Sequence, residues 1–315
     1  METTLLIDGN NNFIRNYVTY SSTTSNGEPY GGVVGFLRSL ASFTDLTKPQ
    51  RVVVIFDGPG GSQRRRAIYS EYKEGRKPSR LNRHVDESIE DQTDNKRLQE
   101  IALAHYLQDL PVHIIRLPNI EADDVIAYLS GYFEGRKVIV SNDMDFYQLL
   151  STDVIMYKPT KKSFYTGINC HEDHGIYPVN FGLARAVVGD RSDNIKGIKG
   201  VGLKTLIKLV PHFAGKDEMT LEDLMRFCGE QEGSKYKLFV ENQKLIADNY
   251  SIMSLRDPLI SSNSISKIKE AIQAAPSMNN TSLRMKLMRD GIDIGNNFLQ
   301  TFLKLSLAGK SKQYV

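Results

Sequence analysis

Three short apolar runs constrain the fold of this 315-residue chain, because an aspartate follows closely after each of them. The runs are LLI at 5–7, RVVVIF at 51–56 and KVIVS at 137–141, and the aspartates are Asp8, Asp57 and Asp143. Continuous β-branched runs of this length are typical of strands buried on both faces of a parallel sheet. The carboxyl ends of parallel strands meet at one edge, so we expect the three aspartates along that edge.

Helical patterns separate the apolar runs. Apolar residues at helical spacing predict helices over 31–46 and 121–133, and 143–150 is expected to form a turn or a helix. Shorter strands are predicted at 111–117 and 154–157. Alternating strands and helices predict an α/β fold with a mostly parallel central sheet flanked by helices. From about residue 178 the strand patterns stop, and the remainder is predicted to be helical.

Composition and the chain termini indicate a soluble intracellular protein with no membrane partner. The formal net charge is only +3, and the two cysteines, Cys170 and Cys228, provide no disulfide framework. The N-terminus lacks a basic region followed by an apolar stretch, so no signal peptide is expected. No apolar run approaches the roughly 20 residues that a membrane-spanning helix needs.

Nine acidic residues in five clusters predict a metal centre. They are Asp8; Asp57; Glu121, Asp123 and Asp124; Asp143 and Asp145; and Asp190 and Asp193. Each cluster alone is also explained by helix capping, turn formation or the helix dipole. Gathering so many carboxylates costs stability unless cations share the site, and oxygen-only ligands suit Mg²⁺ or Mn²⁺. The combination therefore predicts a two-metal centre for phosphoryl chemistry.

A basic segment follows Asp57 directly. It contains eight Lys and Arg residues, namely Arg64, Arg65, Arg66, Lys73, Arg76, Lys77, Arg80 and Arg83. On a helix, one stripe would hold Arg65, Tyr69, Tyr72, Lys73 and Arg76. Such a stripe can neutralise phosphates and stack on unpaired bases, although a solvated basic helix is the simpler explanation. Its place after Asp57 favours contact with nucleic acid.

Closely spaced glycines in GIKGVGLKT (197–205) predict a second phosphate contact. The segment lacks the Gly-Lys-Ser/Thr of a Walker A loop. A helix–hairpin–helix fits better, with one helix ending at Val188 and the next running from Leu203 to Val210. The predicted nucleic-acid contacts here are Lys196, Gly197, Lys199, Gly200, Gly202 and Lys204.

These motifs together resemble the 5′-nuclease (flap endonuclease-like) family. LLIDGNN, IFDGPG, SEYKEGRK, NIEADDVIAYL, SNDMDFYQL and VVGDRSDNIKGIKGVGLKT occur in the order found in that family, over residues 3–211. The resemblance implies a PIN-like α/β nuclease core over 1–177, with a basic helical arch over 60–97. It also implies a helical region over 178–315, with the helix–hairpin–helix at 185–211.

The resemblance also implies roles for individual residues. A first metal site would use Asp57, Glu121, Asp123 and Asp143, with Asp8 supporting it. A second would use Asp145, Asp190 and Asp193, with Asp124 close by. Arg65, Tyr72, Lys73 and Arg76 match basic positions of the arch, and Lys73 and Arg76 would hold the scissile phosphate. Two Mg²⁺ ions are expected, Mn²⁺ can substitute, and the hairpin can hold K⁺ near 197–202.

The activity implied by the resemblance is 5′-to-3′ cleavage of duplex DNA, of RNA in RNA–DNA hybrids and of 5′ flaps, for primer removal in replication. A single-strand-binding protein or a sliding clamp would be candidate partners, and the protein is expected to be a cytoplasmic monomer. The absence of a fused polymerase favours a phage over a bacterial source. The chain departs from the family pattern at Asn142 and in extra residues between Arg80 and Leu98.

Two other functions remain open on the residues alone. A PIN-like endoribonuclease would share the carboxylate edge but would lack the basic arch and the glycine-rich hairpin. A non-catalytic, structure-specific DNA-binding replication protein would keep the arch and hairpin but would have lost its carboxylates to neutral residues. Neither loss is found in this chain.

Overall fold

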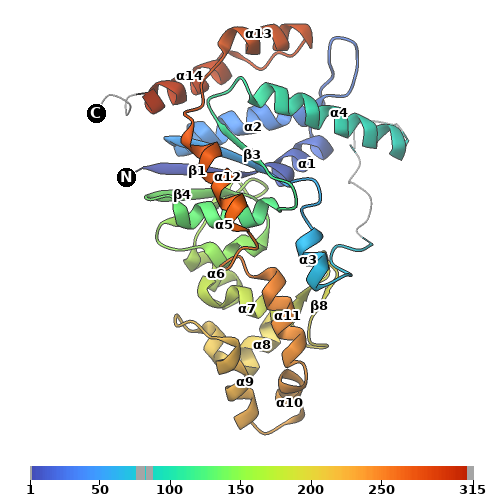
Figure 1. The fold of residues 1–315 in the computed structure, drawn as a ribbon, viewed down its shortest axis with the longest axis vertical. Helices are drawn as coiled ribbons and strands as arrows, with labels where there is room; N and C mark the ends of the chain where they lie inside the picture. The colour runs from blue at the N-terminus through green and yellow to red at the C-terminus, as the bar shows by residue number, and fades with distance from the viewer. Residues whose placement is uncertain (1, 76–81, 83–87, 311–315) are drawn as a thin grey trace.

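The computed structural model describes residues 2–75, 82 and 88–310, and its centre is a six-stranded sheet (Figure 1). The strand order is β3-β2-β1-β4-β5-β6. The strands are β1 (Thr3–Asp8), β2 (Arg51–Phe56), β3 (His113–Arg116), β4 (Arg136–Val140), β5 (Val154–Lys158) and β6 (Ser163–Tyr165). β1 to β5 are parallel, and β6 pairs antiparallel with β5. The mostly parallel sheet and its five predicted strands are confirmed, whereas β6 was not predicted.

Both faces of the sheet are covered, which explains why the strands are continuously apolar. On β1, Leu6 packs in one core, while Leu5 and Ile7 pack in the core on the opposite face. On β2, Val53 packs in the same core as Leu6, and Val54 packs in the same core as Leu5 and Ile7. All five side chains are fully buried. Alternate side chains of a strand point to opposite faces, so a sheet between two layers of helices requires apolar residues at every position.

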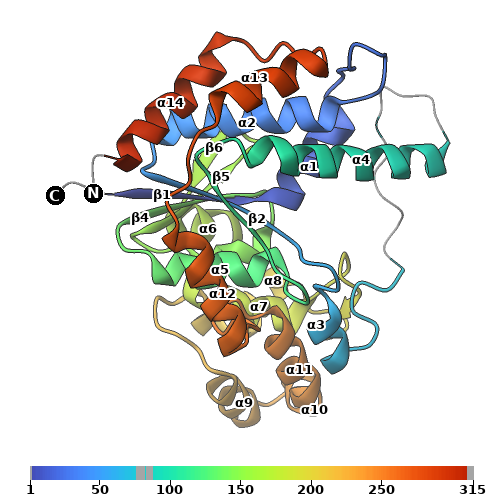
Figure 2. The same ribbon diagram turned by 45° about the horizontal axis from the view of Figure 1, so that its top comes forward.

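Figure 2 shows the two helical layers. One contains α1 (Gly9–Thr19), α2 (Gly31–Thr47), α4 (Ile89–Leu107), α13 (Asn280–Arg289) and α14 (Asn296–Lys310). The other contains α5 (Ala122–Tyr132), α6 (Gly167–His174), α7 (Pro178–Val188) and α12 (Ser262–Gln273). The helices predicted over 31–46 and 121–133 are α2 and α5. Within the described residues, no helix is both long and apolar enough to cross a bilayer.

The chain changes direction across the sheet between β1 and β4. β1 pairs with β2 on one side and with β4 on the other, so their carboxyl ends flank a topological switch point, where ligands of open α/β sheets bind. The turn from β1 into α1 needs Gly9, because a Cβ there would lie 2.8 Å from the Ile55 carbonyl oxygen. Asp8, Asp57 and Asp143 therefore stand at the edge predicted for them.

The basic segment after β2 is less helical than predicted. The helix α3 covers only Gln63–Ile68, and the chain then turns over residues 70–75, with Lys73 at a left-handed φ of 56°. The predicted helical stripe from Arg65 through Lys73 is therefore wrong, because the helix ends before Tyr72. Arg76, Lys77, Arg80 and Arg83 lie outside the described residues. Residues 89–97 of the predicted arch fall within the longer helix α4.

The predicted helix–hairpin–helix is present. The helix α7 ends at Val188, and α8 (Leu203–Leu209) begins where it was predicted. Between them, β7 (Gly189–Asp190) and β8 (Ile195–Lys196) form a small antiparallel ribbon. The expectation that strands stop at 178 is therefore wrong, because strands of two residues leave no periodicity to read. Gly189 has φ 79°, and a Cβ there would lie 2.4 Å from the Gly197 nitrogen.

The last helices return to the sheet. The helices η2 (Pro211–Ala214), α9 (Leu221–Glu230), α10 (Ser234–Glu241) and α11 (Gln243–Met253) extend away from it beyond α7 (Figure 1). By contrast, α13 and α14 bury Leu283, Leu287, Phe298 and Phe302 in the same core as β1. The predicted boundary at 177/178 therefore marks a change in secondary structure, while the packing runs across it.

If α14 completes the core, then shortening its buried side chains should destabilise the whole protein. Phe302 is 0% exposed, so Phe302→Ala should lower the free energy of unfolding by about 3–5 kcal/mol. Leu307 on the same helix is 68% exposed, and Leu307→Ala should change it by less than about 0.5 kcal/mol. Urea denaturation measures both values. Equal effects of the two changes would show that α14 is not part of the core.

Candidate active site

Asp8 and Asp57 follow the neighbouring strands β1 and β2, and hydrogen bonds orient both side chains. The buried Asp8 carboxylate accepts hydrogen bonds from the Asn11 backbone N–H at 3.0 Å and from the Ser141 hydroxyl at 2.9 Å. Asp57 accepts one from the backbone N–H of Ala122 at 2.8 Å, at the start of α5. Both residues thus act as helix caps, and the capping contacts hold their carboxylates at one edge of the sheet.

Asp143 and Asp145 lie in the short 3₁₀ helix region after β4, where η1 covers Met144–Leu149. The Asp143 carboxylate caps this helix and accepts a hydrogen bond from the Asp145 backbone N–H at 2.9 Å. The turn or helix predicted over 143–150 is therefore confirmed. The turn places Asp143 towards β1 and Asp145 towards α7 through its contact with Arg185.

Arg185 of α7 gathers the acids of the hairpin. Its guanidinium donates to Asp145 at 3.1 Å and also pairs with Asp190. The Asp190 carboxylate accepts a further hydrogen bond from the Ser192 backbone N–H at 2.7 Å. The carbonyl of Asp193 accepts from the backbone N–H of Lys73 at 2.8 Å. The ribbon β7–β8 is therefore fixed both to η1 and to the turn that carries Lys73.

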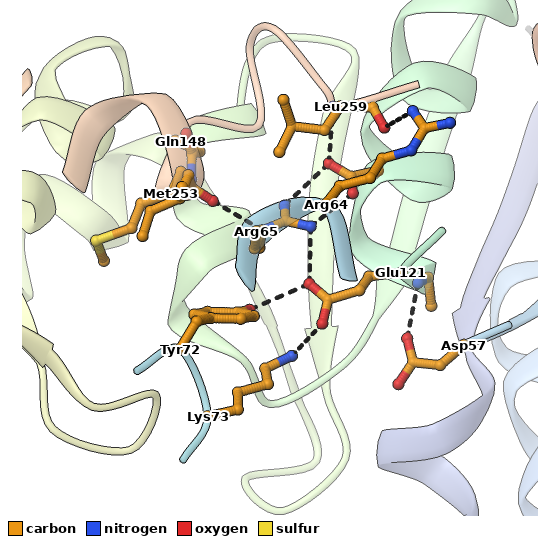
Figure 3. Close-up of polar contacts among 12 residues, drawn as sticks. Asp57, Arg64, Arg65, Tyr72, Lys73, Glu121, Gln148, Met253 and Leu259 are labelled. Carbon is orange, nitrogen blue, oxygen red and sulfur yellow. Dashed lines mark hydrogen bonds and ion pairs between the residues drawn. The ribbon is translucent and has the colours of Figure 1, made fainter. Parts of the chain in front are cut away.

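Glu121 lies at the centre of a second charged network, which Figure 3 shows. Its carboxylate is 2.7 Å from the Arg65 guanidinium and 2.5 Å from the Lys73 ammonium, and Tyr72 donates its hydroxyl at 3.1 Å. Arg65 also donates two hydrogen bonds to Asp124, at 2.7 and 2.9 Å. Asp124 is 1% exposed and therefore points into the protein.

Burial and mutual repulsion raise the pKa of several of these acids. Burial raises the pKa of Asp8 to about 7, and the charges of Asp57 and Asp143 add to the effect against hydrogen bonds that lower it. Burial also raises the pKa of Asp145 to about 7, helped by Asp143 and opposed by Arg185. Burial first, and then Asp143, Asp8 and Asp57, hold the pKa of Asp123 well above its usual range.

These pKa shifts show which acids lie together, because a charge acts strongly only at short range. Asp143 interacts with Asp8 and Asp123 on one side and with Asp145, Asp190 and Asp193 on the other. We call this group the acidic rim. It consists of Asp8, Asp57, Glu121, Asp123, Asp143, Asp145, Asp190 and Asp193.

The acidic rim offers a metal ion carboxylate oxygens only, which is the donor set that Mg²⁺ and Mn²⁺ prefer. Among the described residues, however, no group of three or more Asp, Glu, His or Cys side chains is arranged to hold a metal ion as it stands. Three basic side chains already contact these acids: Arg65 and Lys73 share Glu121, and Arg185 bridges Asp145 and Asp190. The rim therefore fits a divalent ion in donor chemistry, with several carboxylates turned towards basic side chains.

The predicted nucleic-acid contacts divide into exposed and buried groups. Arg66 is exposed, and the half-buried Arg64 donates to the Leu259 carbonyl at 2.7 Å. Arg65 and Tyr72 are each only 4% exposed, so in this conformation they are internal contacts of the protein. Their predicted contact with nucleic acid stays a prediction.

The hairpin presents its predicted contacts at the surface. Lys196, Lys199, Gly200, Gly202 and Lys204 are all exposed, and Gly197 is half-buried. A hollow of about 410 Å³ lies elsewhere, beside α4, whereas the hollow formed by the hairpin measures about 810 Å³. The hairpin hollow is lined by residues 194–202 and by Arg185 and Arg191, among others. Its size and its basic side chains suit an extended polyanion.

Sequence reasoning missed three polar residues that organise the site. Arg185 is the only charged residue in α7, whose sequence is PVNFGLARAVV. A single charge in a mostly apolar helix was the signal that could have revealed it. Ser141 and Gln148 gave no signal, because single polar residues near a strand end are common. Asn142, a departure from the family pattern, donates to the Asn11 side chain and so braces the loop after β4 against α1.

Comparison with known proteins identifies the family. The family model described as the 5′-3′ exonuclease N-terminal resolvase-like domain matches residues 3–175. A 5′-3′ exonuclease of Aquifex aeolicus is 31% identical over 280 residues, which cover 87% of this chain and 92% of the relative. The thermostable DNA polymerase I of Thermus filiformis is 36% identical over 249 residues, 78% of this chain but only 28% of the polymerase.

A solved structure shares the fold. The bacteriophage T5 flap endonuclease, in a complex with DNA and metal ions, superimposes with a TM-score of 0.66 at 18% identity. The superposition covers 96% of this chain and all of that one.

The raised pKa values predict how stability depends on pH in the metal-free protein. A carboxyl group with a raised pKa binds its proton more tightly in the folded chain than in the unfolded one, so the folded state loses stability as the pH rises through the folded pKa. For Asp8 and Asp145 this loss extends to about pH 7. The midpoint of thermal unfolding in EDTA should therefore fall as the pH rises from about 6.5 to about 8.

The predicted fall is compared from about pH 6.5, the ordinary pKa of histidine. Burial lowers the pKa of His113 and His174, so the effect of these two groups on stability lies below that pH. Asp145→Asn removes one titrating carboxyl group and should make the dependence shallower. Scanning calorimetry measures the midpoints. A midpoint that rises with pH in the wild-type protein would contradict the repulsion described for the acidic rim.

Proposed function

Since the chain belongs to the 5′-3′ exonuclease family, we propose that it hydrolyses RNA–DNA hybrids and duplex DNA from 5′ ends, cleaves 5′ flaps, and depends on divalent metal ions. The family assignment makes the protein a 5′-3′ nuclease. The substrates within that class, and a role in primer removal during replication, are proposed here. The observation that carries the proposal is the convergence of eight acids from five separate segments, the hairpin among them, beside Lys73.

The acidic rim would hold two Mg²⁺ ions, for which Mn²⁺ can substitute. Asp57, Glu121, Asp123 and Asp143 would bind the first, supported by Asp8. Asp145, Asp190 and Asp193 would bind the second, with Asp124 close by. The Asp124 carboxylate pairs with Arg65, which also contacts Glu121 of the first set. When bound, such a pair of ions activates a water, stabilises the leaving oxygen and clamps the phosphate.

The chain's own residues would orient the substrate. Lys73 stands on the turn after α3, and its ammonium lies at Glu121, where it can approach a phosphate held at the rim. A fixed cation there stabilises the negative charge that develops on the scissile phosphate. Arg76 would act with it, as the family pattern implies.

The hairpin carries Asp190 and Asp193 of the rim, so it would hold the duplex beside the cleavage point. Its exposed backbone N–H groups and lysines contact phosphates without reading bases, so binding there is insensitive to sequence. We propose that Lys196, Lys199 and Lys204 supply this charge, that the half-buried Arg64 and the exposed Arg66 supply more, and that K⁺ can bind near 197–202. A single-strand-binding protein or a sliding clamp would be the partner at a replication fork, and the protein would act as a cytoplasmic monomer.

Asp145→Asn tests the catalytic role of the rim. The change keeps the side-chain shape but removes one of the three carboxylates proposed to bind the second metal ion. Cleavage of a 5′-labelled flap or hybrid in Mg²⁺ should therefore fall by at least about 100-fold. DNA affinity in a gel shift without Mg²⁺ should be retained. Asp153→Asn is the matched control, since Asp153 is exposed just before β5, at the opposite end of the strands. Wild-type cleavage by Asp145→Asn would refute the proposal.

Lys73→Ala separates catalysis from binding. If Lys73 acts on the charge developing at the phosphate, kcat should fall by about 10–100-fold while KM changes little. Lys204→Ala, which removes an exposed hairpin charge, should do the reverse by raising KM and lowering the salt dependence of binding. Steady-state kinetics on a flap substrate give both constants. A loss of affinity alone in Lys73→Ala would contradict the role assigned to it.

A further inference from the structure

Arg65 differs from its basic neighbours because it is buried and its guanidinium pairs with carboxylates. By contrast, Arg64 and Arg66 donate to the backbone carbonyls of Leu259 and Tyr72. The Arg65 guanidinium donates Nε to the Ile252 carbonyl at 2.8 Å and both terminal nitrogens to the Asp124 carboxylate. One of these terminal nitrogens also lies 2.7 Å from Glu121. Five donors in a rigid plane suit this division of contacts, and a lysine could not reproduce it.

The partners of Arg65 extend to a segment far away in the sequence, residues 252–259, which we call the strap. The Asp124 carboxylate accepts a hydrogen bond from the Leu259 backbone N–H at 3.1 Å. Gln148 of η1 donates to the Met253 carbonyl at 3.1 Å and accepts from the Leu255 N–H at 2.8 Å. The strap therefore joins α3, α5 and η1 around one buried arginine (Figure 3).

The strap lies outside the 3–175 span matched by the family model, and no motif pointed to it. It nevertheless touches the elements that carry Glu121 and Asp145. The single arginine holds Glu121 on one side and the strap on the other, so the orientation of the Glu121 carboxylate depends on both.

We propose that Arg65 is a positioning residue, which fixes Glu121 and Lys73 for cleavage by tying them through Asp124 to the strap, and that it does not contact nucleic acid. The proposal rests on the proposed function, because it assigns Glu121 and Lys73 to cleavage. It differs from the surface contact expected of a basic residue in the arch.

The predicted consequence is a loss of turnover with little loss of binding. Arg65 is 4% exposed, so its removal takes away no surface charge that a phosphate could meet. Its removal leaves Glu121 held only by Tyr72 and Lys73, and so loosens the carboxylate that positions the Lys73 ammonium. A displacement of about 1 Å at a reacting group can cost about 100-fold in rate.

The first test compares Arg65→Gln with Arg66→Gln, the same change at adjacent positions, on a 5′-flap DNA in Mg²⁺. Arg65→Gln should lower kcat by about 100-fold and leave KM within about threefold. Arg66→Gln, which removes an exposed charge, should raise KM and keep kcat. Arg65→Lys should recover only a small part of kcat, since one ammonium cannot reach all three partners. A loss of affinity in Arg65→Gln like that in Arg66→Gln would overturn the proposal.

The second test separates positioning from folding. Arg65→Gln leaves the Asp124 carboxylate buried without its cation, so the midpoint of urea denaturation should fall. Adding Asp124→Asn removes that charge and should restore much of the midpoint, while kcat stays low because Glu121 still lacks its anchor. Recovery of kcat together with stability would show that Arg65 only supports the fold.

The third test does not depend on activity. Hydrogen exchange of the strap amides should be faster in Arg65→Gln than in the wild-type protein and unchanged in Arg66→Gln. Unchanged exchange in Arg65→Gln would overturn the connection to the strap. If the wild-type protein failed to cleave any 5′-ended substrate, the proposed function would fail, whereas this exchange result would still report whether Arg65 holds the strap.

Discussion

Repulsion among carboxylates at the carboxyl end of the sheet is the constraint on which the rest of this structure depends. Parallel strands and the switch point between β1 and β4 bring the acids together, and burial makes their mutual repulsion costly. The protein offsets that cost with three basic side chains. Arg65 and Arg185 each contact two acids, and Lys73 contacts Glu121. These cations come from α3, from the turn after it and from α7, which explains why elements distant in sequence converge on this edge.

The same contacts connect the region that would bind substrate to the acids that would act on it. The turn carrying Lys73 is held against the β7–β8 ribbon, where Asn194 donates to the Glu71 carbonyl at 3.0 Å and Lys196 pairs with the Glu71 carboxylate at 2.9 Å. The exposed Lys196 pair adds little stability on its own. The position of this ion pair matters more. A phosphate backbone that binds the hairpin would compete with Glu71 for Lys196 and so act on the turn that carries Lys73.

The sequence allowed the sheet, its buried strands, the helices α2 and α5 and the hairpin to be predicted, because each follows from a local periodicity or a glycine pattern. The convergence of Asp8, Asp57 and Asp143 was also predictable, since parallel strands must end together. Sequence could not show that Arg65 turns inward, because an arginine in a basic run has the same pattern whether it faces solvent or Asp124. It also could not show the strap or the return of α13 and α14 to the core, since those contacts join residues more than a hundred positions apart. The roles of individual rim acids stay predictions, because capping contacts and metal binding draw on the same oxygens.

We propose above all that the acidic rim is a binding site for a pair of divalent ions. Titration of the metal-free protein with Mn²⁺, followed by electron paramagnetic resonance of the free ion, tests it most directly because it requires no substrate and no turnover. The account predicts two saturable sites per chain, with one of them lost or greatly weakened in Asp190→Asn. Absence of saturable binding, or two sites that persist unchanged in that variant, would contradict it.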